Sequence, residues 1–175
     1  MKAHGFTLIE AVIVISIISI MAAIAAPSMH IIPGFRLKAA ARDMISYFQK
    51  AKVIAAQHNK YCAITFKLPL GNETFDYVIY LDTDQDLEYD DGEKVLYSVK
   101  LSDYKSGICF DPTKGGGDGI TFAPNGNARP SFAFKPMGIP VDSTGQSFVN
   151  HSIYLKNERN DTKQISMNFA GRVKT

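Results

Sequence analysis

The chain has no tryptophan, only two cysteines and almost no net charge, and the last two of these scarcities exclude whole classes of protein. Two cysteines among 175 residues cannot build a disulfide scaffold. Because 19 basic side chains face 17 acidic ones, the net charge of +2 argues against a broadly basic nucleic-acid binder, although a local basic patch is compatible with it. The hydrophobic content of 46% excludes a disordered chain, and the length fits one domain with an appendage.

Catalytic motifs are absent from the sequence as well. The four histidines are scattered, without the spacing of metal ligands, and no serine lies in a nucleophile elbow. The glycine cluster at 115–119 lacks the strand-to-helix setting of a phosphate loop and indicates a flexible connection. We therefore expect a protein that is not an enzyme and needs no cofactor.

Charge is also missing from a long N-terminal stretch, because the 21 residues of 6–26 hold a single ionisable side chain, Glu10. A helix of that length spans about 31 Å, the thickness of a bilayer's hydrocarbon core. The sequence therefore predicts a membrane helix. The alternative is a cleaved secretory signal with Lys2 as its positive end and Ala23-Ile24-Ala25 as its cleavage site, but the apolar run exceeds the roughly 7–15 residues of such signals.

Glu10 needs an explanation of its own. A carboxylate inside a membrane helix costs a few kcal/mol, so it is by default a functional residue with a partner. The alternative is that this side chain, which lies early in the helix, reaches the nearby interface.

The first ten residues, MKAHG followed by FTLIE, resemble the class III signal of type IV pilins and type II secretion pseudopilins. The resemblance implies that a prepilin peptidase cuts after Gly5 and methylates the new N-terminus at Phe6. It also implies that Glu10 pairs with the N-terminal amine of a neighbouring subunit, and an opposite charge would offset the desolvation of this carboxylate. Pro27 falls where many pilins kink the same helix.

The resemblance also implies where the protein works and with what. Its partners would be the prepilin peptidase, other pilin or pseudopilin subunits and the bacterial inner membrane, which it would cross once before assembly into a pilus or pseudopilus. The globular part would be periplasmic. The basic residues Arg36, Lys38 and Arg42 after the helix would by themselves favour the opposite orientation, but long domains translocate largely regardless of flanking charge.

A second helical pattern follows a Pro33-Gly34 break and covers residues 35–58. Its apolar residues recur at three- and four-residue steps and predict a face docked on a sheet; they are Phe35, Leu37, Ala40, Met44, Ile45, Phe48 and Ala55. Residues 6–58 thus form one long helix, bent near Pro27 or Pro33. We expect a leader peptide at 1–5, a transmembrane and assembly helix at 6–28, an amphipathic half at 29–58 and a β-rich head at 59–175.

From residue 61 onward the hydrophobic period changes to two, which is typical of strands. The predicted strands are 61–68, 75–81, 94–101, 107–110, 119–123, 130–135, 151–156 and 163–169, and a last strand follows Gly171. Because no further helix is predicted, we expect an α+β, pilin-like fold in which the long helix packs on antiparallel sheet.

The second half resembles the GspH/FimT group of minor pilins and pseudopilins. The resemblance lies in the order of four stretches, RLKAAARDMISYFQKAKVIAAQHN, YLDTDQDLEYDDGEKVL, ITFAPNGNARPSFAF and ISMNFAGRV, while a tryptophan common before the acidic hairpin is missing. It implies a minor pseudopilin of type II secretion. The alternatives are a FimT-like minor pilin that binds DNA for uptake, and a soluble periplasmic domain behind a cleaved signal peptide.

One stretch is crowded with acidic side chains. They fall at positions 1, 3, 5, 7, 9 and 12 of a calcium-loop frame and are Asp82, Asp84, Asp86, Glu88, Asp90 and Glu93. Position 6 is Leu87 in place of glycine, and strands flank the loop, so it is not an EF-hand. The sequence leaves two interpretations open, a Ca²⁺ site and a solvated hairpin turn.

The two cysteines could form a disulfide in an oxidising compartment. However, Cys62 shares the core face of its strand, while Cys109 alternates with Ile108 and Phe110. We favour two separate buried thiols.

The C-terminal strand carries Arg172 and Lys174, two residues apart. In FimT-like members a Gly-Arg-x-Arg ending is implicated in DNA capture, and lysine here replaces the second arginine. The resemblance thus makes both residues candidates for DNA binding, and the alternative is a pair of solvated charges that protect an edge strand from aggregation.

Overall fold

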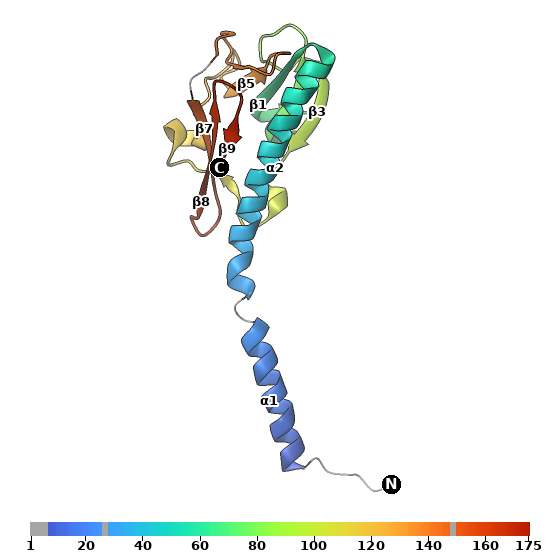
Figure 1. The fold of residues 1–175 in the computed structure, drawn as a ribbon, viewed down its shortest axis with the longest axis vertical. Coiled ribbons are helices and arrows are strands. Elements are labelled where there is room, and N and C mark those ends of the chain that lie inside the picture. The colour runs from blue at the N-terminus through green and yellow to red at the C-terminus, as the bar shows by residue number, and fades with distance from the viewer. Residues whose placement is uncertain (1–6, 26–27, 148–149) are drawn as a thin grey trace.

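The computed structural model describes residues 7–25, 28–147 and 150–175. Two helices, α1 (Leu8–Ala25) and α2 (Ser28–His58), lead from the N-terminal side into a β-rich head, and α1 extends away from that head (Figure 1). Pro27 lies outside the described residues, and so does the kink predicted there. The α+β fold with a long helix packed on antiparallel sheets is confirmed.

The helix α2 starts earlier than the sequence predicted. It runs from Ser28 straight through Pro33 and Gly34, where a break was expected. Pro33 is the sixth residue of the helix, so its ring removes only one backbone hydrogen bond, close to an end where several N–H groups lack partners in any case. The break predicted at Pro33-Gly34 is therefore wrong.

One face of α2 carries the contacts to the sheets. Its fully buried residues are Leu37, Ala40, Ala41, Met44, Phe48, Ala51 and Ala55. Phe35 was placed on this face from its spacing but is 64% exposed, with the Lys38 ammonium 5.8 Å from the centre of its ring. The small alanines let the backbone of the helix approach the strands closely, which a bulkier face would prevent.

Two antiparallel sheets form the head. The first has the order β3-β2-β1-β5-β6, built from β3 (Lys94–Val99), β2 (Glu73–Asp82), β1 (Tyr61–Leu70), β5 (Ser131–Phe134) and β6 (Pro140–Val141). The second has the order β4-β7-β8-β9, built from β4 (Cys109–Phe110), β7 (Asn150–Lys156), β8 (Thr162–Asn168) and β9 (Val173–Lys174). Both sheets contribute buried side chains to one core beneath α2.

Aromatic rings fill the centre of that core. Phe122 and Phe132 stack with ring centres 4.4 Å apart, and Phe48 of α2 meets Phe132 edge-on at 5.3 Å. Phe66 of β1 lies 5.8 Å from Phe122. Offset and edge-on ring pairs of this kind contribute about 0.5–1.5 kcal/mol beyond the area they bury. The rings therefore link α2 to the first sheet and to the segment between β4 and β5, which contains Phe122.

The predicted strands differ from the observed ones mainly where turns replace regular pairing. The strand predicted over 94–101 ends at Val99, and a 3₁₀ turn (Leu101–Tyr104) follows, whose first N–H donates to the Asp76 carboxylate at 2.7 Å. The strand predicted over 119–123 is reduced to one bridge between Ile120 and Ile153. Residues 115–119, where a flexible connection was expected, form a non-helical glycine turn in which the N–H groups of Gly117 and Gly119 donate to the Lys114 carbonyl at 3.1 and 3.0 Å. Two of these differences involve bonds to segments distant in the chain, namely Leu101 to Asp76 and Ile120 to Ile153, which hydrophobic alternation does not reveal.

Candidate functional site

The N-terminal end of α1 is held by a reciprocal pair of hydrogen bonds between Thr7 and Glu10. The Thr7 hydroxyl oxygen accepts from the Glu10 N–H at 3.3 Å, while a Glu10 carboxylate oxygen accepts from the Thr7 N–H at 3.2 Å and from its hydroxyl at 3.0 Å. This is a capping box, in which a threonine and a glutamate three residues later satisfy each other's backbone donors. Glu10 therefore has a local structural partner within its own chain, which the sequence analysis missed although the T-x-x-E pattern was visible.

Apolar side chains cover α1 on every side. All residues of 8–24 are exposed, and large ones reach 83% for Leu8 and 72% for Ile24. Its two serines bond inward, Ser16 to the Val12 carbonyl at 2.7 Å and Ser19 to the Ile15 carbonyl at 2.8 Å. Apart from Glu10, the helix thus presents an uninterrupted apolar surface with no side chain of the head against it.

In the part of the chain that the structure describes, no helix is both long enough and apolar enough to cross a membrane. The predicted cleavage and methylation residues, Gly5 and Phe6, lie outside the described residues.

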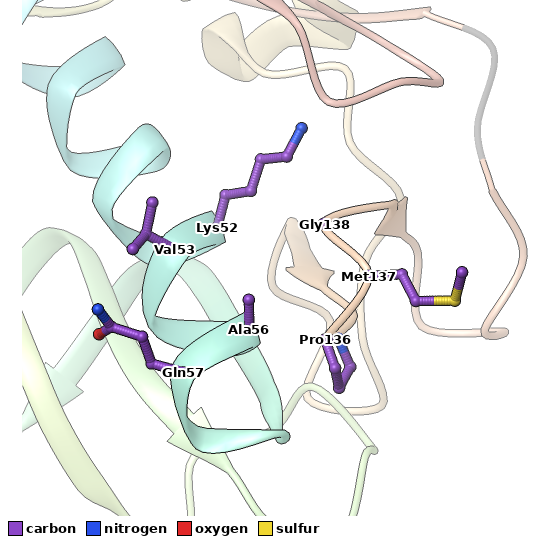
Figure 2. Close-up of a pocket in the computed structure, with 7 residues that line it drawn as sticks. All are labelled: Lys52, Val53, Ala56, Gln57, Pro136, Met137 and Gly138. Carbon is purple, nitrogen blue, oxygen red and sulfur yellow. The ribbon is translucent and has the colours of Figure 1, made fainter.

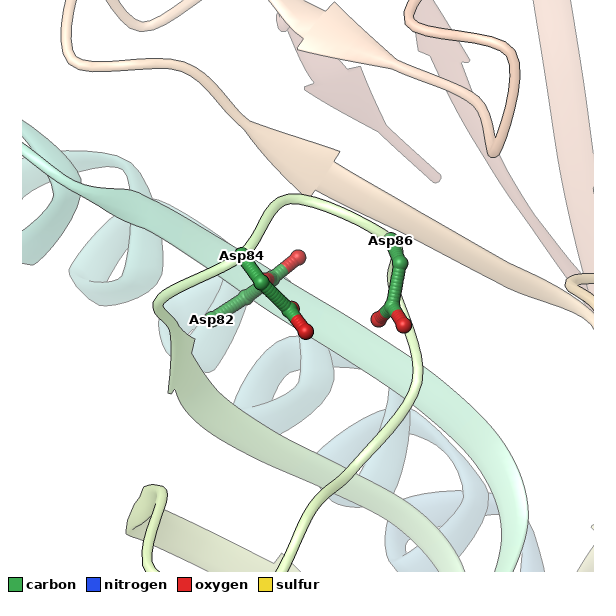
Figure 3. Close-up of side chains that lie close together, drawn as sticks. All are labelled: Asp82, Asp84 and Asp86. Atoms are coloured by element: carbon green, nitrogen blue, oxygen red, sulfur yellow. The ribbon is translucent and has the colours of Figure 1, made fainter.

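The structure brings together three of the six carboxylates predicted to bind calcium. One oxygen from each of Asp82, Asp84 and Asp86 lies within 4.8 Å of the others, on the loop that follows β2 (Figure 3). Asp82 is 1% exposed, whereas the other two side chains face solvent. Asp82 also accepts hydrogen bonds from the N–H groups of Gln85 at 2.6 Å and Leu87 at 3.1 Å. Through these two hydrogen bonds Asp82 stabilises the conformation of its own loop.

The remaining three carboxylates do not join this group. Glu93 accepts from the Thr83 N–H at 2.7 Å and from the Asp90 N–H at 3.3 Å, which closes the loop on itself. Glu88 accepts from the Asn127 side chain and so faces a different segment. The six-ligand frame predicted from spacing is therefore not assembled, because two of its glutamates bond to backbone and amide groups instead.

Leu87 occupies the loop position at which an EF-hand has an invariant glycine. The residue is 1% exposed and packs into a second, smaller core on the far side of the first sheet, beside Tyr80 and Ala63. Its φ of 63° is the left-handed conformation that glycine usually supplies. Burial of the leucine side chain, worth about 1.5–3 kcal/mol, offsets a local backbone strain of about 1–3 kcal/mol.

Burial shifts the titration of Asp82. It raises the pKa of this carboxyl to about 6, against the opposing effect of the two backbone N–H donors.

Burial also raises the pKa of the Cys62 thiol to about 12. Both thiols are free, and Cys109 is exposed, so the expectation of two buried thiols is wrong for Cys109. Alternation along β4 turns Ile108 and Phe110 inward and Cys109 outward.

Lys174 lies exposed on the edge strand β9, and Arg172, also exposed, directly precedes that strand. The turn before them depends on Asn168, which accepts from the Arg172 N–H at 2.9 Å. It also requires Gly171, whose φ is 68° and where a Cβ would lie 2.9 Å from the Gly138 carbonyl. The two basic residues line a cleft of about 190 Å³ with Asn150 and Ser166 among its other residues.

A second basic cleft lies beside the first and was not found from the sequence. It measures about 160 Å³ and is lined by Lys38 and Arg42 of α2, Lys163 of β8, and Ala41 and Thr175. These cations are up to 125 residues apart in the chain, so only the packing of α2 on β8 brings them together. No local pattern in the sequence carries that information.

A hollow lies between the C-terminal half of α2 and the turn from β5 to β6 (Figure 2). It measures about 460 Å³ and contains no carboxylate or histidine among its lining residues. Lys52 runs along it and donates to the Ala170 carbonyl at 3.1 Å, thereby tying α2 to the turn before β9. Met137 is 85% exposed and points away from α2. The hollow has no arrangement for acid–base or nucleophilic chemistry.

Comparison with known families identifies a sequence motif at the N-terminus. Residues 1–26 match the family model described as the prokaryotic N-terminal methylation motif. Comparison with curated proteins and with solved structures gives no match. The chain has a pilin-like α+β fold, in which the long N-terminal helix packs on antiparallel sheets, and the motif covers α1. Its N-terminus is that of the type IV pilins and pseudopilins, which implies processing by prepilin peptidase and assembly with other pilins.

Proposed function

We propose that the protein is a minor pseudopilin of the GspH/FimT group, a structural subunit of the type II secretion pseudopilus. The observation that carries this proposal is α1, which exposes apolar side chains all round and lies within the methylation motif. An apolar helix with no polar face needs either lipid or other apolar helices around it. Such a helix serves as a membrane anchor in the stored subunit and as the packed centre of a filament after assembly.

The proposed maturation uses three residues. Prepilin peptidase cuts after Gly5 and methylates Phe6, and Glu10 then pairs with the amine of a neighbouring subunit. In the free chain the Glu10 carboxylate caps its own helix through Thr7, so its charge is held at the end of α1, where the neighbour's amine has to reach it. A carboxylate that accepts from an ammonium is bound more strongly than one that accepts from a neutral amide.

The proposed location follows from the same N-terminus. The subunit is anchored in the bacterial inner membrane by residues 6–28, with 29–58 leading into a periplasmic head formed by 59–175. The head then becomes the outward-facing part of the assembled filament.

Intact-mass analysis of the protein purified from its host tests this proposal. The expected mass is that of residues 6–175 with one added methyl group. A chain that begins after Ala25 would contradict the proposal, because it would indicate an ordinary signal peptide. A chain that still begins at Met1 in cells with active prepilin peptidase would contradict it as well.

A second candidate function is DNA binding by a FimT-like minor pilin. It is favoured by the exposure of Arg172 and Lys174, which line the same cleft at the edge strand β9. Contacts to phosphates would be independent of sequence, and log affinity for duplex would fall by about 0.9 per unit of log salt for each phosphate neutralised. A gel-shift series on the full chain in detergent, compared with Arg172→Gln plus Lys174→Gln, measures this. Absence of binding at low salt would leave the pseudopilin function alone.

A further inference from the structure

We propose that the acidic loop of one copy, residues 82–93, binds the basic cleft of a second copy and so links the heads of adjacent subunits. The basic cleft is the one lined by Lys38, Arg42, Lys163, Ala41 and Thr175. This inference rests on the proposed function, because packing through α1 brings the copies side by side with the same polarity. The cleft is the site, and the loop of the next copy is its occupant.

The charges of the two surfaces are opposite and strongly segregated. The acidic loop holds seven Asp and Glu residues and no Lys or Arg, in a chain whose net charge is only +2. Three cations surround the basic cleft, and Arg172 and Lys174 lie in the neighbouring one. A nucleic acid would be attracted to the clefts but repelled by the loop, whereas a second copy of this chain complements both.

Neither surface is neutralised within its own chain. The ion pairs of Lys67 with Asp118 and of Lys100 with Glu73 both lie outside the loop and the two clefts. Lys38 and Arg42 are exposed, and so are Asp84, Asp90 and Asp91. Both surfaces therefore keep their charges available for an external partner.

The two surfaces lie at opposite ends of the head. The loop begins at Asp82, which pairs with Tyr61 just beyond the end of α2 at His58. Lys38 lies 20 residues before His58 on the same helix, about 30 Å along its axis. One head therefore cannot place its own loop in its own cleft (Figure 1). A contact between two different patches is heterologous, and its repetition builds an open filament.

The loop is already ordered for such a contact. Asp82 binds two N–H groups inside it, Glu93 closes it, and Leu87 anchors it in the smaller core. Because these bonds restrict the loop before any partner arrives, little conformational entropy is lost on binding. The carboxylates of Asp90 and Asp91 take no part in these bonds and face solvent.

Charge reversal combined with cysteine crosslinking tests the proposal on the full chain in membranes. With Cys109→Ser as background, Asp84→Cys in one copy should crosslink to Thr175→Cys in another. Adding either Asp90→Lys with Asp91→Lys, or Lys38→Glu with Arg42→Glu, should lower the crosslinked fraction about tenfold. Mixing the loop-reversed chain with the cleft-reversed chain should restore it. Asp103→Lys, an exposed reversal outside the loop, is the matched control and should leave crosslinking unchanged.

The outcomes separate this inference from the function on which it rests. Chains that start at Phe6 and enter filaments, yet give no 84–175 crosslink, would overturn the inference alone. A crosslink that survives both reversals would overturn it too, because charge would then not drive the contact. If the cleft reversal abolishes DNA binding in a gel shift and leaves crosslinking unchanged, the cleft serves nucleic acid and the inference fails. Crosslinking of chains that never enter filaments would support the contact and contradict the proposed function.

Discussion

The helices α1 and α2 follow each other in the chain but distribute their apolar residues in opposite ways. The 17 residues of 8–24 in α1 are all exposed, whereas α2 turns Leu37, Met44 and Phe48 into the core and keeps Lys38 and Arg42 outside. A helix with two faces has one fixed partner, which here is the pair of sheets. A helix without a polar face is built for an environment that surrounds it. The difference separates the part of the chain that folds from the part that assembles.

The largest effect should come from removing a ring in the core of the head. Phe132→Ala is expected to lower the free energy of unfolding by about 3–5 kcal/mol, because Phe132 is fully buried between Phe48 and Phe122. The matched substitution Ile15→Ala in α1 should leave the unfolding of the head unchanged, because Ile15 is 64% exposed. Denaturant titration of the full chain in detergent, followed by tyrosine fluorescence, measures both. Equal effects of the two substitutions would erase the distinction between the helices.

The next prediction separates the two roles of Glu10. Glu10→Gln keeps a side chain that can complete the capping box with Thr7 but removes the charge, whereas Glu10→Ala removes both. If the carboxylate pairs with a neighbour's amine, both variants should enter the membrane normally and lose incorporation into filaments. Membrane fractionation and pull-down with other pilins measure the two steps. Normal incorporation of the glutamine variant would limit Glu10 to capping α1.

A smaller effect is expected from the pH dependence of Asp82. Because its pKa is raised to about 6 in the folded chain and is near 3.8 when unfolded, the folded state binds more protons between these values. The stability contributed by this group should therefore rise as the pH falls from 7 to 5. Thermal unfolding of the wild type compared with Asp82→Asn measures the difference between the two pH values. A difference of the opposite sign would mean that the carboxylate is stabilised in its charged form.

Calcium is expected to have the smallest effect. With only Asp82, Asp84 and Asp86 gathered, binding should be no tighter than the roughly 10⁻⁴–10⁻³ M of extracellular modules. Millimolar calcium should raise the melting temperature of the full chain slightly by mass action, and Asp84→Asn with Asp86→Asn should remove that rise. An unchanged melting temperature in the wild type would reduce the loop to a hairpin turn.

Local periodicity predicted most of the fold but did not reveal the basic cleft lined by Lys38, Arg42 and Lys163. The three- and four-residue spacing of Leu37, Ala40 and Met44 identified the docked face of α2, and alternation identified the strands β1 and β2. Phe35 has the same spacing but lies beyond the sheets, so period alone could not reveal that it stays exposed. Where an element ends depends on what the fold places beside it.

The acidic loop and the basic cleft also depend on contacts between segments that local spacing in the sequence does not reveal. Spacing suggested six calcium ligands, but the burial of Leu87 and the bonds of Glu93 depend on neighbouring segments that spacing does not describe. Arg172 and Lys174 were found because the ending from Gly171 to Lys174 resembles that of FimT-like members. Lys163 joins Lys38 and Arg42 only through the packing of β8 on α2.

The way α2 lies against the head has a mechanical consequence. The helix contacts β1 and β5 of the first sheet and β7, β8 and β9 of the second, and near its far end Lys52 bonds to the Ala170 carbonyl. Tension applied along α1 would enter the head lengthwise through α2. The helix would have to slide past both sheets at once, with all of its side-chain contacts loaded in shear together, before any single strand could peel away.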